Sequence, residues 1–251
     1  MTAPPSEKFG DEWTVIAIGV IAMCIATAAH EAIGHGSACL ALGGRITQLT
    51  SVYFQCSARS TWIAAGGPLG NLAAALLAWL GLVATPRTHA QTRLFCLVVL
   101  LISLFWFAGY LIYAAAFLDG DPYFVALDLM GPPVLATRAA MILGGVACYL
   151  LGIFLSRRMT ARIANASQIL RTAWAAASVA AFAAALFYTP DRGGATKQAL
   201  LEIGAASFPM MSRVIVGVRR PDAQPVDRSP VWIGAGVLAF GVFAATLGRG
   251  R

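Results

Sequence analysis

The heptapeptide AHEAIGH, residues 29–35, places two imidazoles and a carboxylate inside an otherwise apolar run. Ionisable side chains are costly in hydrocarbon, so their presence within a membrane-spanning segment indicates a functional site. Neutral imidazole is a preferred zinc ligand, and a neighbouring glutamate can take a proton from an activated water. His30 and His35 are therefore candidate metal ligands, and Glu31 is a candidate general base. The competing interpretation is a structural pair in which Glu31 and one histidine hold helices together.

The spacing of the two histidines is unusual for a zinc-binding helix. In the common HExxH pattern the histidines are four residues apart and share one helix face. Here they are five apart, and an α-helix with 3.6 residues per turn would separate them by about 140°. A single-turn π-bulge absorbs one extra residue, and Gly34 is the least restrained residue available for it. We therefore expect the helix to widen between His30 and His35. The motif resembles the HELLGH helix of the dipeptidyl peptidase III family, which has the same spacing.

Two more motifs follow the histidines along the chain, and the three together resemble the site-2 protease family of intramembrane zinc metalloproteases. The motifs are AHEAIGHGSACLALGGR at 29–45, GPLGN at 67–71 and FLDGD at 117–121. The resemblance implies a three-helix catalytic core over about residues 15–130. It also implies a short membrane-embedded strand or hairpin between the first two core helices, which could add a substrate peptide to its edge.

The resemblance also implies a role for each site residue. Zn²⁺ would be held by His30, His35 and an aspartate, with Glu31 as the general base. Asp119 matches the family's third ligand literally, and Asp121 could serve instead, although an Asp-Gly-Asp-Pro run also fits an ordinary turn. Asn71 would orient the substrate or the site, or would simply make a hydrogen bond between packed helices.

This sequence departs from the family pattern upstream of the third motif. The family usually carries Asn and Pro there, and these positions hold Leu111 and Ala114. The departure supports a rival, non-enzymatic reading, in which a degenerate relative binds client proteins or acts like a transporter. Retention of Glu31 favours the enzyme, because a site that only stores metal does not need that carboxylate.

The elements that must position these residues are membrane helices. The chain has 251 residues, 59% of them hydrophobic and 12% charged, which is typical of a polytopic membrane protein. Apolar stretches of roughly 20 residues predict an all-α protein with about six spans. We place these spans at 13–38, 62–84, 94–118, 133–155, 170–189 and 231–247. We expect a single membrane domain over 1–251, with additional helices over 131–251.

The remaining features bear on partners and location. The net charge of +7 fits topology signals and lipid headgroups better than nucleic acid. The N-terminal MTAPPSEKFGDEW is a poor signal peptide. We expect a multi-pass protein of the bacterial inner membrane with cytoplasmic termini, acting on a membrane protein or peptide. Its oligomeric state is left open.

The chain has five cysteines and one long segment outside the predicted spans. No CxxC pair occurs, so a disulfide framework is not expected. Cys39 follows His35 by four residues, and we interpret it as a small core residue in preference to a metal ligand. The segment from Pro190 to Pro230 mixes apolar and basic residues. It could form an interfacial helix, cap the site or receive a substrate.

Overall fold

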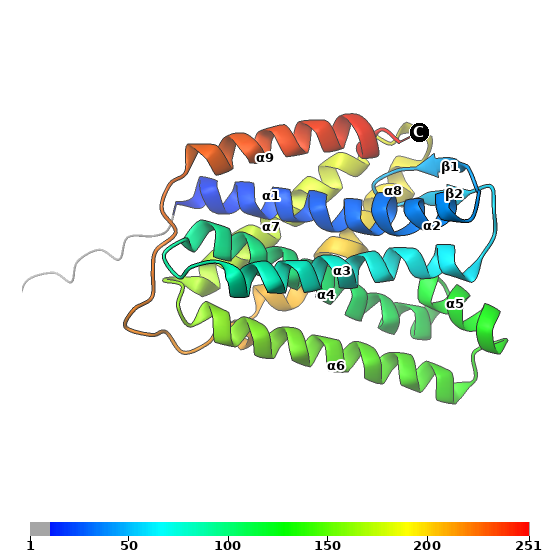
Figure 1. Ribbon diagram of the computed structural model, residues 1–251, viewed down its shortest axis with the longest axis horizontal. Helices are drawn as coiled ribbons and strands as arrows, with labels where there is room; N and C mark the ends of the chain where they lie inside the picture. Colours follow the sequence, from blue (N-terminus) through cyan, green and yellow to red (C-terminus); the bar gives the residue numbers. More distant parts are fainter. Residues whose placement is uncertain (1–10, 251) are drawn as a thin grey trace, which may run out of the picture.

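The computed structural model describes residues 11–250 as a bundle of helices that run along one long axis (Figure 1). The N-terminal residues of the weak signal-peptide motif lie largely outside this range. The first helix is continuous through three segments, α1 (Glu12–Ala28), η1 (Ala29–His35) and α2 (Gly36–Ala41). It begins at Asp11, whose carboxylate accepts a hydrogen bond from the backbone N–H of Thr14. This capping satisfies an N–H group that the helix start leaves unpaired.

A short antiparallel hairpin follows the first helix, as expected. It consists of β1 (Ile46–Leu49) and β2 (Phe54–Cys56). A disulfide joins Cys39 of α2 to Cys56 of β2 and thereby ties the hairpin to the helix. Cys39 is fully buried, as expected of a core residue, but the expectation that the cysteines form no disulfide was wrong. The pairing depends on the hairpin fold, which brings two Cα atoms 17 residues apart in sequence to 6.0 Å. Spacing along the chain does not show this.

The next two helices form the centre of the bundle. Ser60 caps α3 (Thr61–Ala84), and α4 (Ala90–Phe117) follows after a short loop. The side chains of α4 are almost continuously buried from Leu97 to Trp106. This burial occurs because α4 packs against α1, α3 and α6 together. Because α4 lies at the centre of the bundle, its side chains can pack against the residues of the candidate site.

The chain then turns sharply to begin α5 (Asp121–Met130). Leu118 and Gly120 both have positive φ angles, of 56° and 87°. The second is in a region that glycine enters without steric cost. These two residues form the turn between the end of α4 and Asp121, the first residue of α5.

The second half of the chain surrounds this core. The longer helices are α6 (Leu135–Thr160), α7 (Ala166–Ala185) and α9 (Pro230–Phe243), which continues into η6 (Ala244–Gly248). The connection between α7 and α9 contains α8 (Arg192–Ala199) and several short turns: η2 (Thr189–Asp191), η3 (Leu200–Ala205), η4 (Phe208–Met211) and η5 (Arg213–Ile215). Both α7 and α9 pack against α1.

The length and composition of these helices confirm the predicted membrane class. Within residues 11–250, five helices are long and apolar enough to cross a bilayer: Glu12–Ala41, Thr61–Ala84, Ala90–Phe117, Leu135–Thr160 and Pro230–Gly248. A sixth candidate is a bent pair, Ala166–Ala185 with Thr189–Ala205, whose halves meet at 93°. The predicted fifth span, 170–189, therefore ends in a sharp bend.

Candidate metal centre

The helix widens where the sequence predicts. Residues 29–35 form the π-helical segment η1, whose i→i+5 hydrogen bonds bring residues five apart onto one face. The rings of His30 and His35 consequently lie edge to face, with centroids 4.9 Å apart. Both side chains are buried, at 2% and 5% exposure. The widened turn solves the geometric problem that the extra residue creates.

Close approach of α3 keeps η1 in place. A side chain at Gly34 would collide with the backbone of Gly66, and one at Gly66 would collide with Gly34 in return. A side chain at Gly67 would occupy the space of both imidazole Nε2 atoms. The glycines of α3 therefore allow close helix contact, and Gly67 also leaves open the space in front of the histidines.

Asp121 completes a cluster with the two histidines. Its Oδ2 atom lies 3.3 Å from Nε2 of His30 and 3.2 Å from Nε2 of His35. Together these three side chains offer ligand atoms that all lie within 4.8 Å of one another. A charge-assisted hydrogen bond is shorter, about 2.7–2.9 Å. Two atoms that bind one tetrahedral zinc at 2.0–2.1 Å lie about 3.3 Å apart. The cluster could thus hold a metal ion.

The other candidate aspartates have different partners. The carboxylate of Asp119 accepts hydrogen bonds from the hydroxyl of Tyr113, at 3.3 Å, and from the backbone N–H of Gly120, at 2.8 Å. Asp128 accepts a hydrogen bond from Thr61. The turn at Leu118 and Gly120 leaves Asp121, the first residue of α5, facing the histidines. The structure therefore brings Asp121, and not Asp119, into the cluster.

Each imidazole is oriented by a polar partner at its second nitrogen. Nδ1–H of His35 donates to the carbonyl of Ile63 at 2.6 Å. Nδ1 of His30 lies 3.0 Å from the Asn71 amide, and Oδ1 of that amide has no partner among residues 11–250. With the amide turned over, Oδ1 accepts from Nδ1–H. Such contacts fix the ring planes so that both Nε2 atoms face Asp121.

Aromatic rings complete the support of the histidines. His30 stacks on Trp106 of α4, with centroids 4.6 Å apart and planes 11° from parallel. His35 stacks on Phe54 of β2, with a centroid distance of 5.2 Å. The disulfide that holds the hairpin therefore also holds the ring against His35. These contacts restrict the imidazoles to rotamers that face Asp121.

The electrostatics of the cluster keep Asp121 ionised. Burial of its carboxyl group raises the pKa, but the Nε2 groups of the two imidazoles that face it lower the pKa by more. The net effect is a pKa below the usual range for aspartate. An ionised carboxylate is the form that binds a metal ion.

Glu31 is buried beside the cluster, with 3% exposure, and its Oε2 atom has no hydrogen-bond partner in the described part of the chain. Unpaired buried carboxylate oxygens are costly, so an unsatisfied one indicates a bound water or ligand. A metal ion with an associated water would give this oxygen a partner. The two Nε2 atoms and the space at Gly67 also fit such an ion.

A large cavity of about 890 Å³ opens onto these residues. Its lining includes the edge residues of β2, the turn before α5 and side chains of α8 and η3. One of the latter is Glu202, which is buried and whose Oε1 accepts a hydrogen bond from Gln198 at 2.8 Å. Glu202 is not among the site residues that were singled out from the sequence. The polar sequence of α8 gave no signal that the segment folds back over the site.

Comparisons with known proteins add no relative to this description. No protein family matches the chain, and neither a curated protein nor a solved structure matches it. The functional assignment therefore depends on the geometry and chemistry of the site.

Proposed function

We propose that this protein is an intramembrane zinc metalloendopeptidase that cleaves a peptide bond in a transmembrane or membrane-proximal segment. The observation that carries the proposal is the arrangement of four side chains. His30, His35 and Asp121 converge on one point, and the carboxylate of Glu31 lies buried and partly unpaired beside them. All open onto one cavity, and the histidines belong to a helix that is apolar enough to span a bilayer.

The donor set favours zinc and hydrolysis. Two imidazoles and one carboxylate, with a further position open, form a common catalytic zinc site. The same three ligand types also bind non-haem iron. An oxygen-activating iron site has no need of a second carboxylate that is not a ligand, such as Glu31, whereas a hydrolytic site requires a base. When bound, zinc would polarise the scissile carbonyl and lower the pKa of a water molecule.

Glu31 performs the proton transfers in this proposal. Its carboxylate takes a proton from the attacking water and delivers it to the leaving amine nitrogen. A carbon–oxygen bond forms, the peptide carbon–nitrogen bond breaks, and Glu31 returns to its ionised state. Burial of Glu31 excludes bulk water, which would otherwise compete for the proton.

The hairpin supplies a means of holding an extended substrate. Strand β2 lines the cavity and, within residues 11–250, pairs only with β1. Its outer edge can therefore accept main-chain hydrogen bonds from a substrate peptide. A membrane helix must unwind to be cleaved, and pairing with β2 compensates for the helical hydrogen bonds that it loses.

The order of the three sequence motifs supports the same assignment, because the site-2 protease family shows a similar order. The membrane helices and the clustered ligands are consistent with that resemblance. Here Asp121 takes the role of third ligand, two residues after the position that matches the family motif. Cys39 and Cys56 favour a cavity that opens to an oxidising compartment, since disulfides persist there.

Metal content is the first test. The full-length protein would be purified in detergent without added metal, and bound zinc would be measured by mass spectrometry. We expect one zinc ion per chain, lost in His35→Ala and Asp121→Ala and retained in Asp119→Ala. Absence of zinc from the wild type, even after reconstitution, would favour a non-catalytic client-binding or transporter-like protein.

A cleavage assay separates the enzyme from a metal-binding relative. Peptides with a transmembrane segment, mixed with the zinc-loaded protein in detergent, would be analysed for cleavage products. Glu31→Gln should retain zinc and lose cleavage. Cleavage by Glu31→Gln at the wild-type rate would contradict the mechanism.

A further inference from the structure

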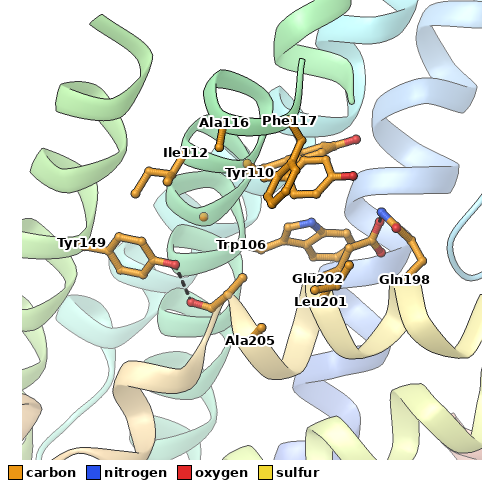
Figure 2. A pocket seen from close by; sticks show the side chains of 13 residues that line it. Trp106, Tyr110, Ile112, Ala116, Phe117, Tyr149, Gln198, Leu201, Glu202 and Ala205 are labelled. Atoms are coloured by element: carbon orange, nitrogen blue, oxygen red, sulfur yellow. Dashed lines mark hydrogen bonds between the residues drawn. The ribbon is translucent and has the colours of Figure 1, made fainter. Parts of the chain in front are cut away.

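A second, smaller cavity lies beside the metal cavity, between α4, α6 and the end of η3 (Figure 2). Its volume is about 270 Å³, and its walls are mainly aromatic rings and aliphatic side chains. Tyr149 of α6 closes one side, where its hydroxyl donates a hydrogen bond to the carbonyl of Ala206 at 2.8 Å. None of these elements belongs to the three sequence motifs except α4.

The two cavities are continuous in their lining. Tyr110, Tyr113, Gln198 and Glu202 each line both of them. In Figure 2 the carboxylate of Glu202 and the amide of Gln198 meet beside the Trp106 ring. The smaller cavity therefore adjoins the metal cavity at these four side chains.

Trp106 forms the wall between the small cavity and the metal centre. Its ring stacks on His30 and also lines the small cavity. It is 1% exposed, yet its indole N–H has no hydrogen-bond partner among residues 11–250. Buried indole N–H groups usually find a partner. The nitrogen itself has almost no exposed surface, so Trp106 contributes its ring to the cavity wall.

We propose that this cavity is a specificity subsite that takes one large apolar side chain, aromatic or long aliphatic, next to the scissile bond of the substrate. The inference rests on the proposed function and adds a substrate class to it. A dry apolar cavity of about 150 Å³ binds benzene, so 270 Å³ accommodates a phenyl or indole ring. A lipid tail could not form hydrogen bonds with Gln198 and Glu202, the polar residues that line both cavities.

Small residues keep the cavity open and allow it to be filled deliberately. Ala116 of α4 and Ala205 of η3 line it and have exposed side chains, so a larger residue can be introduced without disturbing the core. Ala140 of α6 is also exposed but does not line the cavity. Ala116→Phe and Ala205→Phe are thus two independent filled variants, and Ala140→Phe is their matched control.

The test measures binding of peptide hydroxamates, which chelate zinc, to the full-length zinc-loaded protein in detergent. Two compounds differ only in the residue next to the hydroxamate, glycine or phenylalanine. Burial of a phenyl group should make the second bind about tenfold or more tightly. We expect this advantage in the wild type and in Ala140→Phe, and its loss in both filled variants, with the glycine compound bound equally by all.

Each other outcome is informative. Equal affinity for the two compounds in the wild type would overturn the subsite, as would an advantage that persists in both filled variants. A lipid retained by the wild type and lost from both filled variants, without a phenylalanine advantage, would reassign the cavity to lipid. If the wild type binds zinc and the glycine compound, these failures concern the subsite alone. Absence of zinc and of both compounds would overturn the proposed function and the subsite together.

Discussion

Two π-helical segments, η1 and η3, contribute buried glutamates to the same cavity, and they differ in how the rest of the protein holds them. Segment η1 carries Glu31 in the sequence AHEAIGH, and η3 carries Glu202 in LLEIGA. The first lies within a continuous helix of spanning length, whereas the second ends a short helix after a sharp bend. Both have a glycine shortly after the glutamate.

The surroundings of the two glutamates differ in hydrogen bonding and packing. Oε1 of Glu202 accepts a hydrogen bond from Gln198, whereas Oε2 of Glu31 has no partner in residues 11–250. The glycines differ in the same sense. Gly34 is pressed against the backbone of α3, but the nearest atoms to a side chain at Gly204 would be 3.6 Å away. Tight packing thus fixes the helix geometry at η1 and leaves the unpaired carboxylate as the group available for chemistry.

The largest expected effect comes from the two glutamates. Glu31→Gln should lower the rate of transmembrane-peptide cleavage by about 10²–10⁴-fold, because the general base is removed. Glu202→Gln retains an oxygen that can accept from Gln198 and should lower the rate by less than about tenfold. Cleavage products would be quantified by mass spectrometry, with zinc content as the control for folding. An equal loss in both variants would remove the distinction between η1 and η3.

The disulfide tests whether η1 depends on covalent support. The double variant Cys39→Ser, Cys56→Ser opens a loop with a sequence separation of 17 and should lose about 3 kcal/mol of stability. Hydrogen exchange would compare residues 29–56 with residues 192–205. We expect protection to fall in the first region and to stay unchanged in the second. Similar losses in both would show that the hairpin stabilises the entire end of the bundle.

The two glycines provide a matched pair for packing. Gly34→Ala places a methyl group against the backbone of Gly66 and should cost about 1–3 kcal/mol. Gly204→Ala makes only ordinary contacts and should be neutral or slightly stabilising, since alanine favours a helix by about 0.5–1 kcal/mol. Thermal unfolding in detergent measures both. A Gly34→Ala variant as stable as the wild type would mean that η1 tolerates separation from α3.

The smallest effect concerns the two amides that contact ionisable side chains. Asn71→Ala removes the partner of Nδ1 of His30 and should weaken zinc binding by about 10–100-fold. Gln198→Ala removes the partner of Glu202 and should leave zinc affinity within about threefold, because Glu202 is not part of the ligand cluster. Competition with a zinc chelator gives both values. Equal weakening would link η3 to the metal centre.

Much of this site could be predicted from the sequence, because its first part is local. His30, Glu31 and His35 lie within one helical turn and a half, so their spacing alone determines that an α-helix must widen there. The apolar runs likewise specify membrane helices through their length. The hairpin between the first two helices was expected from the family resemblance, which depends on the order of short local motifs.

The rest depends on contacts between distant segments. The choice of Asp121 over Asp119 depends on the turn at Leu118 and Gly120, whereas the sequence motif matches Asp119 literally and offers Asp121 only as the alternative. The disulfide depends on the hairpin returning to the end of α2, and Glu202 reaches the cavity only because the chain bends by 93° after α7. Spacing along the chain determines which side chains can share one helix face. Only tertiary packing decides which side chains from other helices meet them there.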